Sequence, residues 1–270
     1  MIHPGLRDSL ARIEAHFQAD QRCAAMYLWG SLGNKTADAY SDVDIAIVVD
    51  DSEYQDVKSE LRSLCEILCG PILAWLPEGE KPQSCNFAFL FAFQDEVLLY
   101  DFYLSSLMDA HKRPGAAPKK VIFDRDGLFE TSHSLPSTPV PDANGLRRNI
   151  TTYWIYMYLN GKYYSRNDIY KMLYVQQVLF QTNLKILLTS NGLTPANWWV
   201  SDVHGLPENL QKELKIYFPA PDVQALVRAL WEEIDLFARD ARAACTQNGV
   251  EYPENLEAEV RKHLLHIGAR

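Results

Sequence analysis

The chain lacks the features typical of membrane proteins, disulfide-rich proteins and proteins that bind long nucleic acids. Charges interrupt every apolar run before the roughly 18 residues that a membrane helix needs. The five cysteines are an odd number and lack the paired spacing of a zinc site. With 26 basic against 35 acidic residues the formal net charge is −9, which disfavours binding to many phosphates. We therefore expect a cytoplasmic protein with reduced thiols and no membrane or long nucleic acid partner.

The sequence predicts two domains of different class. It shows no repeat and no low-complexity tract, and Met1-Ile2-His3-Pro4-Gly5 does not resemble the start of a signal peptide. A stretch rich in Ser, Thr and Pro, residues 126–144, is typical of a linker. We predict an α+β domain at 1–141, with a mixed β-sheet flanked by helices, and an all-α helical bundle at 142–270.

The spacing of apolar residues and the positions of turn residues predict the helices and strands along the chain. In the first half they predict a helix at 6–17, a strand at 24–29, a strand in the run 41–49 that includes Asp42 and Asp44, and a helix starting near 50–52 and ending near Leu68. Leu61, Leu64, Ile67 and Leu68 are expected to face inward. Further strands are predicted at 72–76, 86–93 and 97–104, with a hairpin at 94–96. In the second half, helices are predicted at 146–159, 167–190, 208–218, 223–245 and 254–267.

Two acids enter the start of a strongly apolar, β-branched run. Asp42 and Asp44 stand at the start of the run that continues as Ile45-Ala46-Ile47-Val48-Val49, which is typical of a buried strand. Residues two apart on a strand point to the same face, with Cα atoms roughly 6.5 Å apart. Since unpaired carboxylates are costly to remove from water, the pair predicts a bound divalent metal ion.

A third acid and a small-residue turn complete the candidate site. Asp101 interrupts the apolar strand predicted at 97–104; if that strand lies beside the first, three carboxylates meet on one sheet face, an arrangement suited to two metal ions. Gly30 and Ser31 follow the strand at 24–29, where α/β folds commonly bind phosphate through backbone N–H groups.

The Gly30-Ser31 turn, the Asp42-Val43-Asp44 strand and the lone Asp101 together resemble the DNA polymerase β-like nucleotidyltransferase superfamily. With the helical second half, the chain is most similar to antibiotic nucleotidyltransferases, in particular the lincosamide branch with a helical C-terminal domain. Segments 101–104, 121–124 and 160–166 carry that likeness. The resemblance implies the nucleotidyltransferase fold and, as in many relatives, a homodimer.

The resemblance implies transfer of a nucleoside monophosphate from an NTP, expected to be ATP, to a hydroxyl of a small molecule, with release of pyrophosphate. Asp42 and Asp44 would hold Mg²⁺, and Asp101 would either accept the hydroxyl proton or ligate a second Mg²⁺. Gly30, Ser31 and Lys35 would bind the phosphates. Arg166 would reach the departing pyrophosphate from the helical half, for which Arg is well suited.

The sequence restricts the identity of the acceptor less than it restricts the type of reaction. A lincosamide is the main expectation, and an aminoglycoside, with O-adenylyl transfer, is the alternative that the acidic balance favours. A tRNA or protein acceptor and a catalytically silent nucleotide-binding protein are further alternatives.

Several residues have a structural and a functional interpretation. Seven aromatic residues of the second half could line an acceptor pocket, although core packing is the simpler interpretation of each: Tyr153, Trp154, Tyr156, Tyr163, Tyr164, Tyr170 and Tyr174. Glu232, Glu233 and Asp235 could attract a cationic drug, or could form a solvated helix face. His263 and His266 are expected at the surface.

Overall fold

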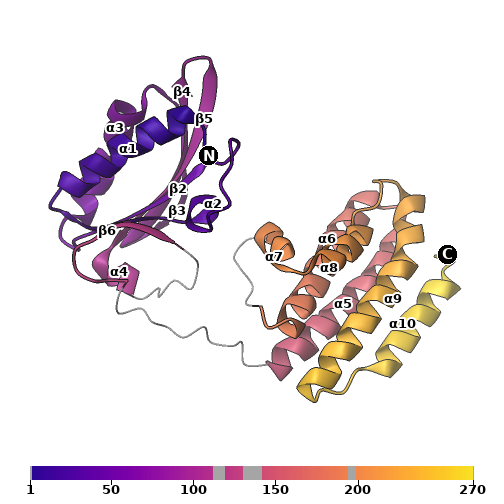
Figure 1. Ribbon diagram of the computed structural model, residues 1–270. Coiled ribbons are helices and arrows are strands. Elements are labelled where there is room, and N and C mark those ends of the chain that lie inside the picture. Colours follow the sequence, from indigo (N-terminus) through magenta and orange to yellow (C-terminus); the bar gives the residue numbers. More distant parts are fainter. Residues whose placement is uncertain (1, 112–118, 130–141, 194–198, 270) are drawn as a thin grey trace. The chain divides into compact units, whose positions relative to one another are not determined.

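The computed structural model describes residues 2–111, 119–129, 142–193 and 199–269. The chain divides into two compact units, Met1–Pro136 and Ser137–Arg270, each described by itself (Figure 1). The predicted boundary at 141/142 and most of the predicted linker fall on residues 130–141, outside the described ranges. No helix in those ranges is long and apolar enough to span a bilayer. The five cysteines are all buried and free, as predicted.

The first unit contains one six-stranded mixed sheet. Its strands are β1 (Cys23–Leu28), β2 (Val43–Val49), β3 (Ile72–Lys81), β4 (Ser84–Phe93), β5 (Glu96–Ser106) and β6 (Lys120–Asp124). The order across the sheet is β3-β4-β5-β2-β1-β6. β2 and β5 run parallel and the other neighbouring pairs are antiparallel. The predicted mixed sheet and the β4–β5 hairpin are therefore confirmed.

Two strands differ from the prediction. β3 continues past its predicted end at Leu76, because it is an edge strand that tolerates Pro77 and takes up a register shift between Pro77 and Gly79. β6 was not predicted as a strand; it adds the opposite edge by pairing with β1.

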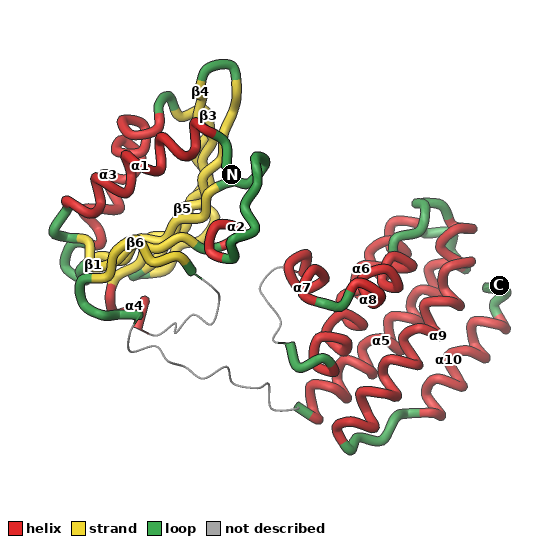
Figure 2. Tube along the Cα trace, in the orientation of Figure 1, coloured by secondary structure: helices red, strands yellow, loops and turns green. Residues whose placement is uncertain are grey.

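Helices α1 (Pro4–Ala19) and α3 (Tyr54–Cys69) cover one face of the sheet, here called the helix face (Figure 2). Pro4 begins α1, where a missing N–H costs nothing, and His3 Nδ1 accepts the Gly5 N–H. In α3, Leu61 is buried as predicted, but the inward placement of Ile67 is wrong, since its side chain is 78% exposed. Each residue of an α-helix rotates about 100° around the axis, so Ile67, six residues after Leu61, lies on a different side of the helix.

The opposite face carries Asp44 and Asp101 and is called the carboxylate face. Because side chains alternate along a strand, Val43, Ile45 and Ile47 enter the core under the helices while Asp44 points the other way. At the β1 side, Leu128 packs against Ala25 and Val48 on this face, beside α4 (Leu107–His111).

The second unit is helical, as predicted. Its elements are α5 (Ala143–Tyr164), α6 (Ile169–Ser190), α7 (Trp199–Gly205), α8 (Glu208–Glu213), a 3-10 turn (Leu214–Tyr217), α9 (Val223–Asn248) and α10 (Glu254–His266). α7 was not predicted, and the helix expected at 208–218 is instead α8 followed by the 3-10 turn. Gly249 ends α9 in the left-handed conformation that favours glycine.

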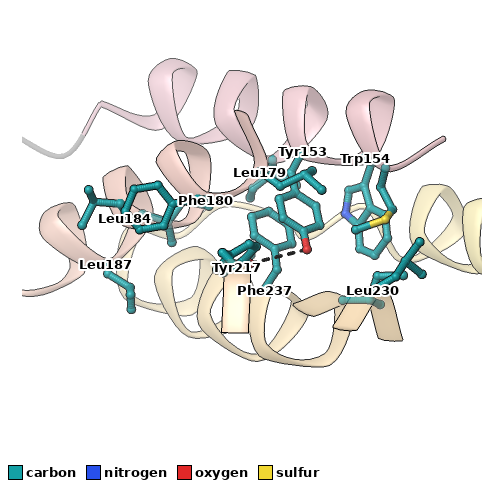
Figure 3. Close-up of a cluster of buried hydrophobic side chains, with 14 of the residues drawn as sticks. Tyr153, Trp154, Leu179, Phe180, Leu184, Leu187, Tyr217, Leu230 and Phe237 are labelled. Atoms are coloured by element: carbon teal, nitrogen blue, oxygen red, sulfur yellow. Dashed lines mark hydrogen bonds between the residues drawn. The ribbon is translucent and has the colours of Figure 1, made fainter. Parts of the chain in front are cut away.

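Aromatic side chains fill the core of this unit. Tyr153 stacks on Phe237 and lies edge-on to Trp154, and the Tyr153 and Tyr217 hydroxyls are 3.5 Å apart (Figure 3). Tyr153 and Trp154 are therefore core residues and not faces of an acceptor pocket. Tyr170 and Tyr174 are exposed, and His263 packs against the ring of Tyr158.

Glu233 corrects the prediction of a solvated acidic face on α9. Its side chain is fully buried, and the amide of Gln176 on α6 donates a hydrogen bond to it. Burial raises the pKa of Glu233 to about 8, so its carboxyl is mostly protonated at neutral pH. The carboxyl belongs to the contact between α6 and α9.

Candidate active site

Asp44 and Asp101 are direct neighbours across two parallel strands. Asp44 on β2 is the Cα partner of Asp101 on β5, so the two side chains leave the same face of the sheet. Adjacent strands are roughly 4.8 Å apart, which brings the two carboxylates within close range. Asp101 and Asp44 therefore share one face, as expected, but Asp42 is not part of the strand as predicted, because β2 begins at Val43.

Asp42, immediately before β2, adds its charge to this pair. Burial, followed by the charges of Asp42 and Asp101, raises the pKa of Asp44 to about 7. Burial also raises the pKa of Asp101, as do the charges of Glu78 and Asp42. The three acids therefore repel one another, and a bound cation would relieve the repulsion.

Gly30 lies directly against this cluster, and Ser31 follows it in the chain. The predicted turn is a short helix, α2 (Gly30–Gly33), entered through Trp29, whose N–H donates to the Asp44 carbonyl at 3.2 Å. Gly30 has φ +54°, and a Cβ there would lie 1.9 Å from Asp44 Oδ2. Glycine is required at this position because the backbone conformation and the contact with Asp44 both exclude a side chain.

Ser31 contributes a hydroxyl with no partner. Its Oγ is buried and forms no hydrogen bond with the described part of the chain. A buried hydroxyl left unpaired costs about 1–3 kcal/mol, so a partner for Ser31 Oγ would stabilise the site.

Two further residues of this site were not predicted. Glu78 on β3 is close enough to Asp101 to raise its pKa, and its Oε2 accepts the Asn86 amide at 2.9 Å. Trp29 lies beside Asp44 on the carboxylate face and is 40% exposed. The sequence signals that could have identified them are an acid directly after Pro77 and a tryptophan directly before Gly30 and Ser31.

Lys35 belongs to the first unit and Arg166 to the second, and each is described within its own unit. Lys35 is exposed after α2, and lines a cavity of about 310 Å³ with Arg7 and Leu32. Arg166 is exposed at the end of α5 in the second unit, where its N–H donates to the Tyr163 carbonyl at 3.1 Å. Their phosphate-binding roles remain predictions.

The family model described as streptomycin adenylyltransferase matches residues 7–267, nearly the whole chain. The chain belongs to this family. The predicted class of enzyme, a nucleotidyltransferase, is thereby confirmed, as is its link to antibiotic modification. Within that class, membership of the streptomycin adenylyltransferase family favours the aminoglycoside alternative and gives no support to a lincosamide acceptor.

Solved structures were compared as well. An aminoglycoside 6-adenyltransferase from Bacillus subtilis is 17% identical, with 97% of both chains covered and a TM-score of 0.44. A nucleotidyltransferase-like protein from Exiguobacterium sibiricum is 10% identical, covering 88% of this chain and 76% of that one, with a TM-score of 0.37. A cyclic dinucleotide synthase from Elizabethkingia meningoseptica is 14% identical, covering 98% and 88%, with a TM-score of 0.26. The comparison with curated proteins gives no match.

The residues of this streptomycin adenylyltransferase family member fit the divalent metal ion that nucleotidyl transfer implies. Carboxylate oxygens are the hard ligands that Mg²⁺ takes, and burial together with the charges of Asp42 and Asp101 raises the pKa of Asp44, so a bound cation would favour its ionised form. In the described residues no group of three or more His, Cys, Asp or Glu side chains forms a preformed metal cage. Mg²⁺ does not need one, since it commonly binds one or two carboxylates and completes its shell with substrate phosphates and water.

Proposed function

We propose that the protein transfers an adenylyl group from ATP to a hydroxyl of an aminoglycoside and releases pyrophosphate. The observation that carries the proposal is the direct pairing of Asp44 with Asp101 beside the Gly30–Ser31 helix, in a chain of the streptomycin adenylyltransferase family. Small polycationic acceptors also suit a protein with net charge −9.

Asp42 and Asp44 would hold the metal ion. When bound, this ion supplies positive charge that neutralises the triphosphate oxygens. Gly30 keeps the Asp44 carboxylate in place, because any side chain at position 30 would displace it. Phosphoryl transfer depends mainly on positioning the reactants and neutralising their charge, so a carboxylate held in a fixed position would contribute much of the catalysis.

Asp101 would accept the proton of the attacking hydroxyl. Burial and the charges of Glu78 and Asp42 raise its pKa, which makes its carboxylate a stronger base than an exposed aspartate. Ser31 Oγ would donate a hydrogen bond to a phosphate oxygen and so satisfy an atom that is otherwise buried and unpaired. Lys35 and Arg166 are proposed as further phosphate contacts.

Glu78 would recognise the cationic acceptor. It is exposed beside Asp101, and the Asn86 amide orients its carboxylate. An ammonium group of the acceptor that pairs with Glu78 would lie close to the residue that takes the hydroxyl proton. A neutral acceptor would gain nothing from this contact.

The test is incubation of the purified protein with ATP, Mg²⁺ and a panel containing streptomycin, other aminoglycosides and lincosamides. Mass spectrometry should show one aminoglycoside gaining an adenylyl group, with one pyrophosphate released for each product. The Asp101→Asn variant serves as the control. The proposal fails if only lincosamides are modified, or if ATP binds and no acceptor is modified.

A further inference from the structure

Lys119 lies in the same row of the sheet as the paired carboxylates. β6 pairs with β1 through Val121 with Tyr27 and Lys120 with Leu28. One residue further, this register places Lys119 opposite Trp29, whose N–H bonds to the Asp44 carbonyl. Lys119, Trp29, Asp44 and Asp101 therefore follow one another across four neighbouring strands or their ends.

The Lys119 side chain is on the carboxylate face. Its Nζ lies 4.4 Å from the centre of the Phe129 ring and 5.2 Å from that of Tyr27. Tyr27 is the register partner of Ala46, which shares its side of β2 with Asp44. Lys120, the next residue, points to the other side and is exposed.

The Lys119 ammonium forms no ion pair with any described residue, although it is half-buried. Burial lowers the pKa of Lys119, and the charge of Asp124 offsets this effect only in part. Aromatic rings attract an ammonium through their faces and leave its hydrogens free to bond elsewhere. A partly desolvated cation without a counter-ion, on the face where a triphosphate would lie, is suited to an anionic ligand.

The spacing agrees with a triphosphate that begins at the carboxylates. Two strand spacings separate the backbones at positions 44 and 119, roughly 10 Å. A triphosphate extending from Asp44 and a lysine side chain reaching back from β6 can together bridge this distance. The sheet itself fixes the spacing, because both residues belong to the same unit.

We propose that Lys119 binds the β- and γ-phosphates of the nucleotide and stabilises the departing pyrophosphate. The inference rests on the proposed function. In the step concerned, the acceptor oxygen bonds to the α-phosphorus and the bond from that phosphorus to the α,β-bridging oxygen breaks. The electron pair of that bond goes to the pyrophosphate, whose added negative charge Lys119 would face, while the hydroxyl proton goes to Asp101.

The test compares Lys119→Met and Lys119→Arg with Lys120→Met, which removes the same charge from the opposite side of the strand. Equilibrium binding of ATP and of AMP, each with Mg²⁺, is measured by calorimetry, and inhibition of transfer by pyrophosphate is measured in the steady state. We expect Lys119→Met to weaken ATP binding and pyrophosphate inhibition about tenfold and to lower kcat about 10- to 100-fold. AMP affinity and the acceptor KM should stay within about twofold.

Lys119→Arg should retain most of the pyrophosphate inhibition, and Lys120→Met should behave as wild type. The inference is overturned if Lys119→Met matches Lys120→Met, or if it weakens ATP and AMP equally, which would indicate general damage to the site. Should the wild type bind ATP and transfer nothing, the proposed function fails, while the comparison of ATP with AMP still decides the role of Lys119.

Discussion

Gly30→Ala tests whether Asp44 must be held where the structure has it. Left-handed backbone at φ +54° costs a residue with a Cβ about 1–2 kcal/mol. The added Cβ would lie 1.9 Å from Asp44 Oδ2, so the carboxylate must move by about 1.5 Å to restore normal contact. A displacement of that size at a reacting centre can lower the rate about 100-fold. We therefore expect kcat/KM to fall at least 100-fold, with a loss of stability of only about 1–2 kcal/mol.

The matched control is Gly249→Ala. Gly249 has φ +62°, and a Cβ there would meet nothing within 4 Å, so this variant carries the backbone strain without the contact. Steady-state adenylyl transfer and thermal unfolding should be measured for both variants. Both should melt a few degrees lower than wild type, and only Gly30→Ala should lose activity. Equal activity in the two variants would refute the argument that Gly30 exists to make room for Asp44.

Three further predictions concern the buried acids. Asp101→Asn should lower the rate of adenylyl transfer about 10²- to 10⁴-fold, because the acceptor of the hydroxyl proton is lost. The affinity for MgATP, measured by calorimetry, should stay within a few-fold of wild type, and a parallel loss of binding would contradict this role. In chelator, the contribution of Asp44 to stability should be complete below about pH 4 and should be lost as the pH rises through its folded pKa of about 7. Urea unfolding of wild type and Asp44→Asn across this range should differ by that contribution. Wild type should lose thermal stability as the pH rises through about 8, where Glu233 ionises, and Glu233→Gln should not show this loss. If the difference in melting temperature between the two proteins is the same at every pH, Glu233 is not protonated in the folded state.

The carboxylate pair was predictable because strand geometry is local. Asp44 in a β-branched run and Asp101 in an apolar run each point away from a core that their neighbours define. Only their adjacency needed the fold, since nothing local specifies that β2 pairs in parallel with β5. The helical second half was predictable for a similar reason: its apolar residues recur with the helical period over long stretches.

Other features depend on partners far away in the sequence. Glu233 looks solvent-exposed beside Glu232, yet Gln176 on another helix offers a hydrogen bond that makes burial tolerable. Glu78 belongs to a strand end that exists because β4 continues to pair with it. Lys119 gains its position from an edge strand of five residues, too short to produce a periodic signal.

Three polar groups near the paired carboxylates of the first unit each lack, in the described residues, a partner that a bound nucleotide could supply. Ser31 Oγ is buried without a hydrogen bond, Lys119 is half-buried without an ion pair in the described residues, and Asp44 lies among like charges. Buried side-chain atoms without a hydrogen bond in the described residues also occur in the helical unit, for example Trp154 Nε1 and Asn160 Oδ1, so an unpaired group alone does not mark a binding site. What distinguishes the carboxylate face is that an unpaired hydroxyl, a half-buried cation and a set of like-charged acids belong to the same part of one sheet. A triphosphate with its metal ion carries both signs of charge and meets all three requirements together.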